Sequence, residues 1–319
     1  MTFYILRRVA VGALLLLLMS FIFFILTVVT PGEPISSGEN PKLHEEQIQR
    51  ILHRRGLDLP WYQRYPAYLG ALTHGDLGDS YQYNEPVTTL LSQRVPNSVL
   101  LLGTALAISI GIGVPLGIFA ATRQYSKLDM TTSLISYVGI STPSFILGIY
   151  LLLIFGVYLR SALHVSFPIF GMHASGDTSI PDLLYHMVLP VASLAIQQIA
   201  FFSRFMRAGM LEVLHQDFIR TARAKGLAPE RVNYKHALRN AIIPIITLTA
   251  LQIPFLVSGA IITEYIFSWP GMGQLAYQAV VIRDYPTILG VLMLVAFLTV
   301  VANLIADVFY AVVDPRIRY

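Results

Sequence analysis

The feature that most constrains this chain is a series of long apolar runs. The first run, over residues 9–29, holds 21 positions without a charged side chain, and five similar runs follow it. A helix needs about 20 apolar residues to cross the hydrocarbon core of a bilayer. We therefore expect an all-α integral membrane protein with six transmembrane helices. The expected spans cover residues 9–29, 98–121, 130–159, 185–205, 241–267 and 288–313.

Composition supports a membrane location. Only 13% of the residues are charged and 55% are hydrophobic, whereas about 25% of the residues of a soluble domain are charged. The first apolar run follows Arg7 and Arg8, and it is longer than the roughly 7–15 residues of a secretory signal core. No small-residue cleavage pattern follows this run, so we expect it to be retained as a membrane anchor.

The basic residues are spread unevenly over the connectors between the apolar runs. If the N-terminus lies inside, the inner segments hold 14 of the 22 Lys and Arg residues, with Arg204 and Arg207 counted with the connector that they adjoin. The two short outer loops then hold one each, Arg160 and Arg283. Cytoplasmic loops of membrane proteins carry an excess of Lys and Arg. This distribution predicts that both termini are cytoplasmic.

The first outer loop, residues 30–97, is predicted to be structured. Asn40 and Gly56 are suited to begin and end one short helix, and a second helix opens at Asp58 and Pro60 and ends near Gly75. The second helix is rich in Trp and Tyr, which is typical of a membrane interface. A packing cap over the spans and a gate that touches substrate are both open interpretations.

One connector gathers positive charge between two apolar runs, the stretch "DFIRTARAKGLAPERVNYKHALRNAIIP" from Asp217 to Pro244. Asp217 is expected to cap a short helix that Gly226 ends in the left-handed conformation. Pro229 is expected to begin a second helix that runs to about Arg239. The connector is therefore predicted to form a cationic helix–turn–helix on the cytoplasmic side.

Three functions fit such a connector. A DNA-binding element is disfavoured, because a segment connected to two membrane spans cannot easily enter a major groove. We therefore expect no nucleic acid partner. A cationic belt on anionic lipid headgroups is physically sound. A docking element for a cytoplasmic protein is the third function.

Sequence resemblance favours the docking element. "RTARAKGL" followed by "HALRNAIIP" resembles the cytoplasmic loop of permease subunits of binding-protein-dependent ABC importers. That loop is written E-A-A, three residues, Gly, nine residues, I-x-L-P. Here Arg220, Thr221 and Ala222 stand at E-A-A, Gly226 matches, and residues 236–239 replace I-x-L-P, which is the form of the dipeptide, oligopeptide and nickel branch.

Further segments resemble that branch in the same order along the chain. They are "GLDLPWYQRY", "GDLGDSY", "ITEYIFSWPGMGQL", "RDYP" and the ending "DPRIRY". The whole chain is similar to the first of the two membrane subunits of a dipeptide permease. The resemblance implies one transmembrane permease domain over residues 1–319, of the type I importer fold, with an ATPase-docking loop at residues 206–240.

The resemblance also implies the partners. They are a second, homologous permease subunit in a heterodimer, two cytoplasmic ABC ATPase subunits, an extracytoplasmic binding protein and the lipid bilayer of a bacterial or archaeal plasma (inner) membrane. The chain has no G-x-x-x-x-G-K-[ST] phosphate loop. We therefore expect that this chain is not an enzyme and binds no cofactor. ATP and Mg²⁺ are expected to bind to the ATPase subunits.

The cargo is expected to be a di- or oligopeptide. A nickel importer permease of the same family is the alternative, although the eight His residues form no close pair. An ion-driven secondary transporter is a weaker rival, because it would need an intramembrane carboxylate relay.

Two sets of residues are candidates for function. The residues expected to couple the chain to the ATPase are Asp217, Arg220, Thr221, Ala222, Arg223 and Gly226. Polar residues inside spans are candidate pathway residues, and those selected are Ser141, Gln252, Glu264, Asn303 and Asp307. For each pathway candidate, interhelical hydrogen bonding without substrate contact is the competing interpretation. Gly113 and Gly117, in "GIGVPLG", are expected to allow close helix packing rather than nucleotide binding.

Overall fold

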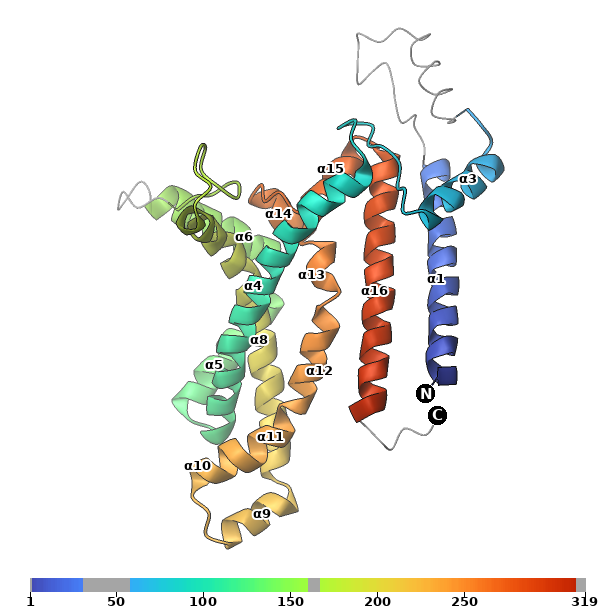
Figure 1. The fold of residues 1–319 in the computed structure, drawn as a ribbon. Helices are drawn as coiled ribbons and strands as arrows, with labels where there is room; N and C mark the ends of the chain where they lie inside the picture. The colour runs from blue at the N-terminus through green and yellow to red at the C-terminus, as the bar shows by residue number, and fades with distance from the viewer. Residues whose placement is uncertain (1, 31–57, 160–166, 314–319) are drawn as a thin grey trace. The chain divides into compact units, whose positions relative to one another are not determined.

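The computed structural model describes residues 2–30, 58–159 and 167–313, and the side chains of 6–305 within these ranges (Figure 1). These residues form helices and loops, without a named strand among them. The chain divides into two compact units. Unit 1 comprises Met1–Pro96 and Gly271–Tyr319, and unit 2 comprises Asn97–Pro270.

Four helices of the described ranges are long and apolar enough to cross a bilayer. They are α1 (Thr2–Val29), α4 (Val87–Thr122), α8 (Ile180–Leu214) and α16 (Tyr285–Val313). Two bent pairs of helices pass the same test, 127–141 with 144–158 and 229–241 with 243–258. If each bent pair is one span, the described ranges hold up to six spans, which is the number that the sequence predicts. The second pair begins in the charged connector at Pro229, however, whereas the expected fifth span begins at residue 241.

The third expected span is not one continuous helix. It divides into α5 (Lys127–Ser141), α6 (Ser144–Leu151) and the π-helix η1 (Leu152–Tyr158), with a bend of 100° between α5 and α6. Thr142 at the bend is extended, with ψ 118°. A residue before proline disfavours the helical conformation, and Pro143 has no N–H to continue the helix.

The fifth expected span is also broken. It contains α12 (Ile243–Gln252), α13 (Phe255–Ser258) and α14 (Ile261–Ile266). Between α13 and α14, Gly259 has φ 78° and ψ 163°, a conformation that is open essentially to glycine alone. In contrast, α4 and α8 continue through Pro115 and Pro190.

In unit 2, α4 approaches α8 closely along a stripe of glycines. A Cβ atom at Gly113 would lie 2.8 Å from the carbonyl oxygen of Ile199, and one at Gly117 would lie 2.5 Å from that of Ser203. Contacts this short do not occur between real Cβ atoms and backbone. The predicted packing role of Gly113 and Gly117 is confirmed.

In unit 1, α1 packs against α16. A Cβ atom added at Gly12 of α1 would lie 2.8 Å from Cγ1 of Val300 in α16. The helix predicted after Pro60 is confirmed as α3 (Trp61–Thr73). Tyr65 of α3 stacks edge-on against Phe21 of α1, with ring centroids 5.2 Å apart. The other helix expected in this loop, residues 40–56, lies outside the described residues.

A buried carboxylate joins two distant segments of unit 1. Asp284, which is 1% exposed, accepts hydrogen bonds from the Ser80 hydroxyl, the Tyr81 backbone N–H at 3.0 Å and the Thr287 hydroxyl at 2.8 Å. The helix that precedes it, α15 (Met272–Val281), is not foreseen by the sequence analysis. Buried Met272 and Leu275 of α15 pack against Val87 of α4.

The glycine stripe gives the first prediction. Gly117→Ala places a methyl group against the backbone of α8, so we expect the free energy of unfolding to fall by about 1–3 kcal/mol. Gly111→Ala is the matched control, because nothing lies within 4 Å of that Cβ position. Thermal unfolding of the purified membrane protein measures both variants. Equal melting temperatures for the two variants would contradict the close α4–α8 contact.

Candidate functional site

The charged connector forms a helix–turn–helix at one end of unit 2 (Figure 1). Its first helix is α9 (Asp217–Ala224). After a short turn, α10 (Pro229–Arg231), the π-helix η2 (Val232–Ala237) and α11 (Leu238–Ala241) follow one another. The predicted pair of helices, with the second one beginning at Pro229, is confirmed.

The start of α9 differs from the prediction by one residue. Gln216 is the N-cap, extended at ψ 152°, and Asp217 is the first helical residue, so its prediction as the cap is wrong. A carboxylate in the first turn still interacts favourably with the helix dipole. Asp217 Oδ1 lies 3.4 Å from Arg220 Nη1, but the two side chains are 96% and 72% exposed. Such an exposed pair contributes little to stability.

The end of α9 is fixed by a Schellman motif. The N–H of Gly226 donates to Arg223 O at 2.9 Å, and the N–H of Leu227 donates to Ala222 O at 3.4 Å. Gly226 has φ 76°, which confirms the predicted left-handed conformation. Nothing lies within 4 Å of its Cβ position. The requirement for glycine is therefore conformational, because neighbouring atoms leave room for a side chain.

The inner face of α9 is part of the unit 2 core. Ile219 is fully buried and Ala222 is 7% exposed. They belong to one apolar cluster with residues of α4, of α8 and of the second helix of the connector. Its members from these elements include Val114 and Ile118, Phe202, Met206 and Met210, and Val232, Ala237 and Ala241. Helix α9 therefore packs on η2 and belongs to the same apolar cluster as residues of two spans.

The outer face of α9 carries charge. Asp217, Arg220, Thr221 and Arg223 are exposed, whereas Ala222 points into the core. The hydroxyl group of Thr221 donates a hydrogen bond to Asp217 O within the helix, at 3.0 Å. Five of the six predicted coupling residues, Gly226 included, are thus accessible to another protein.

Three of the predicted pathway residues belong to unit 2. Ser141 is exposed at the end of α5, and Gln252 is half-buried at the end of α12. Glu264 is fully buried in α14, where Oε1 accepts hydrogen bonds from the Ser98 hydroxyl at 2.8 Å and the Ala260 N–H at 3.1 Å. This carboxylate is part of the core around the break between α13 and α14.

The other two pathway candidates lie on α16 in unit 1. Asn303 is exposed, and the side chain of Asp307 lies outside the described residues. Within unit 2, the structure joins Glu264 to Ser98. The contact of the pathway candidates with cargo stays a prediction.

Sequence reasoning missed an ion pair between α5 and α8. Arg207 donates from Nε to Asp129 Oδ1 at 2.6 Å and from Nη2 to Oδ2 at 2.9 Å. The backbone N–H of Tyr125 also donates to Asp129, at 2.9 Å. A usable signal was present, because an arginine inside an otherwise apolar helix requires a partner.

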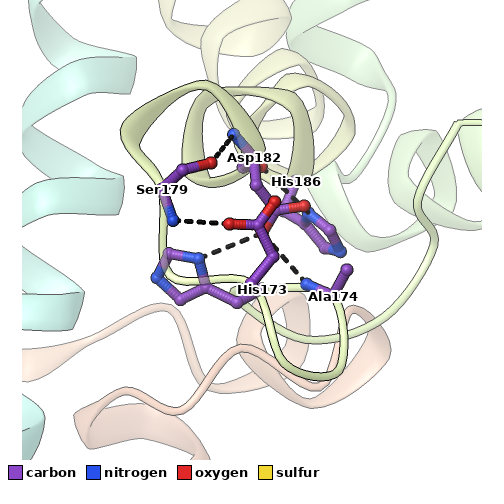
Figure 2. A network of polar contacts seen from close by, with 6 residues as sticks. His173, Ala174, Ser179, Asp182 and His186 are labelled. Atoms are coloured by element: carbon purple, nitrogen blue, oxygen red, sulfur yellow. Dashed lines mark hydrogen bonds and ion pairs between the residues drawn. The ribbon is translucent and has the colours of Figure 1, made fainter.

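A second missed network surrounds Asp182 in the first turn of α8. Figure 2 shows His173 and Ala174 turned toward this carboxylate, with His173 Nδ1 and Ala174 N each 3.0 Å from Oδ2. His186 Nδ1 lies 2.9 Å from Asp182 O. The network fastens the preceding loop to α8. Among the described residues, no cluster of three His, Cys, Asp or Glu is arranged to hold a metal ion.

Comparison with known proteins places the chain in a family. Residues 113–319 match the family "Binding-protein-dependent transport system inner membrane component". Residues 1–102 match the N-terminal family of such membrane components. The chain belongs to the binding-protein-dependent transport system inner membrane components. It is an integral membrane subunit of such a system and is not itself an enzyme.

Relatives match along their whole length. The oligopeptide transport system permease protein AppB of Bacillus subtilis is 38% identical over 100% of both chains. A putative peptide permease protein of Brucella suis is 41% identical over 99% of this chain and 98% of its own. A probable peptide ABC transporter permease protein of Sinorhizobium fredii is 34% identical over 99% of each.

Solved structures agree on the fold. An inward-facing structure of the MetNI methionine ABC transporter superposes with a TM-score of 0.54 at 21% identity. The match covers 71% of this chain and 97% of that chain. An amino acid ABC transporter gives a TM-score of 0.52 at 18% identity, over 71% and 95%. These likenesses support the helical importer-permease fold.

The attachment of α9 to the core gives the second prediction. Ala222→Leu overfills the apolar cluster, and we expect a loss of stability of about 1–3 kcal/mol with faster hydrogen exchange in α9. Ala224→Leu on the exposed side of the same helix is the control, and we expect little change. Unaltered exchange in Ala222→Leu would show that α9 is not packed on the core.

Proposed function

We propose that this chain is the transmembrane subunit of an ATP-driven ABC importer and forms the pathway for di- or oligopeptides. The observation that carries the proposal is the end-to-end match, at 38–41% identity, to an oligopeptide and a putative peptide permease. The absence of a phosphate-loop motif in the sequence fits ATP hydrolysis in another subunit.

The proposed assembly has four further components. A second, homologous permease subunit completes the pathway as a heterodimer, and two cytoplasmic ABC ATPase subunits bind ATP and Mg²⁺. An extracytoplasmic binding protein delivers the cargo. We place the chain in a bacterial or archaeal plasma (inner) membrane, with both termini in the cytoplasm, because 14 of its 22 basic residues then lie inside.

The proposed coupling is mechanical. The exposed charges of Asp217, Arg220 and Arg223 orient α9 on an ATPase subunit, since complementary charges set the register of an interface. Ala222 and Ile219 fasten the other face of α9 to the core shared by α4 and α8. A displacement of α9 by the ATPase then moves these spans with it, because packed cores transmit strain.

The proposed pathway uses polar residues of the spans. Ser141, Gln252, Asn303 and Asp307 are proposed contacts for the polar backbone and ends of a peptide. Glu264 is proposed to contribute from within the core, because its hydrogen bonds to Ser98 and Ala260 define the shape of the chain before α14.

The third prediction concerns Gly226. Gly226→Val forces a β-branched residue to φ 76°, at a cost of about 1–2 kcal/mol, which lowers the population of the docked geometry roughly 5- to 30-fold. Gly226→Asn is the control, because Asn tolerates this conformation. We expect substrate-stimulated ATPase activity and uptake to fall in Gly226→Val and to persist in Gly226→Asn. Normal coupling in Gly226→Val would reject the docking assignment.

The proposed function itself is tested by purification and reconstitution. An affinity-tagged chain, expressed with its neighbouring transport genes, should co-purify with a second permease and with ATPase subunits. In vesicles with the binding protein, peptide uptake should require ATP. Uptake of Ni²⁺ in place of peptide would favour the nickel alternative. Uptake driven by an ion gradient without ATP would reject the proposal.

A further inference from the structure

A small cavity of about 140 Å³ lies between α5 and α8, within unit 2. Hydroxyl groups and arginines dominate its walls, and no carboxylate residue lines it. The lining residues are Thr132, Ser133, Ser136, Tyr137, Ser203, Arg204, Arg207 and Ala208. Nothing in the coupling or pathway roles proposed above uses this cavity.

The hydroxyl groups in these walls are available to a ligand. Ser136 is 6% exposed and Ser203 is 2% exposed, yet neither forms a hydrogen bond within the described part of the chain. Other helical hydroxyls bond to their own helix, as Thr131 does to Lys127 O at 2.8 Å and Ser193 does to Pro190 O at 2.8 Å. Ser136 and Ser203 both line the cavity, so an occupant with polar atoms can form hydrogen bonds with their hydroxyl groups.

The charge of the cavity is positive. Asp129 does not line the cavity, and it neutralises Arg207 through the two hydrogen bonds described above. Arg204 stacks over the ring of Tyr137, with its guanidinium carbon 5.0 Å from the centroid, and has no carboxylate partner among the described residues. The guanidinium of Arg204 and several hydroxyl groups therefore line the same cavity.

We propose that this cavity is an oxyanion site that binds a phosphate group, with Arg204 supplying the charge and Ser136 and Ser203 supplying hydrogen bonds. A planar guanidinium with hydroxyl donors suits phosphate oxygens. A metal cation would meet a like charge, and an apolar group would leave the hydroxyls unsatisfied.

The phosphate group has two possible sources, a phospholipid and free inorganic phosphate. The surroundings favour the phospholipid. On α5, beside Ser136, the apolar side chains of Leu134, Ile135 and Val138 are 60–65% exposed. Acyl chains can lie along this surface while the headgroup phosphate enters the cavity, as in other basic pockets between membrane helices.

The test uses the purified, delipidated complex that contains this chain. Native mass spectrometry counts bound phosphatidylglycerol, and thermal unfolding is followed with phosphatidylglycerol, with inorganic phosphate, or with chloride at equal ionic strength. The variants are Arg204→Gln and the double variant Ser136→Ala with Ser203→Ala. Thr131→Ala is the matched control, because its hydroxyl is bonded within α5. A cooperative thermal unfolding transition in the absence of ligand shows that a variant is folded.

We expect the parent and Thr131→Ala to bind the lipid equally. Arg204→Gln and the double serine variant should lose roughly tenfold or more in affinity, and Arg204→Lys should recover part of the loss because it keeps the charge. Stabilisation by inorganic phosphate alone, lost in the same variants, would support the site with free phosphate as its source. Equal responses of all variants, or protection by a peptide but by neither phosphate source, would overturn the proposal.

Discussion

The close approach of α4 to α8 is the contact on which the rest of unit 2 depends. Gly117 brings the backbone of α4 so near Ser203 that one methyl group cannot fit between them. This proximity lets Phe202 and Met206 of α8 share an apolar cluster with α4 and with Ile219 of α9. Helix α9 thereby belongs to the same apolar cluster as residues of two spans. This shared packing is what the proposed mechanical coupling requires, because packed interiors have low compressibility.

The sequence predicts those parts of the fold that local physics decides. Apolar runs of sufficient length locate the spans, and Gly226 locates the end of α9, because both signals are complete within a few neighbouring residues. The breaks in the spans are different. The helix is interrupted at Pro143, whereas α8 continues through Pro190. Which outcome occurs depends on whether neighbouring helices can satisfy the freed backbone groups, and that is a tertiary property.

The polar interior shows the same limit more strongly. Glu264 is a predicted pathway residue, and the structure shows that it accepts a hydrogen bond from Ser98, 166 positions away. Asp129 and Arg207 are 78 positions apart and form a bidentate pair. No local pattern connects such partners. The residues of α9 were selected as a candidate site because their sequence resembles the cytoplasmic loop of importer permeases, whereas the polar pairs could be found only in the folded chain.

The makeup of unit 1 has a consequence for how the protein is made. This unit combines residues 1–96 with residues 271–319, and Asp284 is bonded to Ser80 across the gap. During translation, α1 is made before unit 2, whereas its packing partner α16 is made after it. Unit 2 is complete in sequence before α16 exists. The contact between α1 and α16 can therefore form only after the residues of unit 2 have been synthesised.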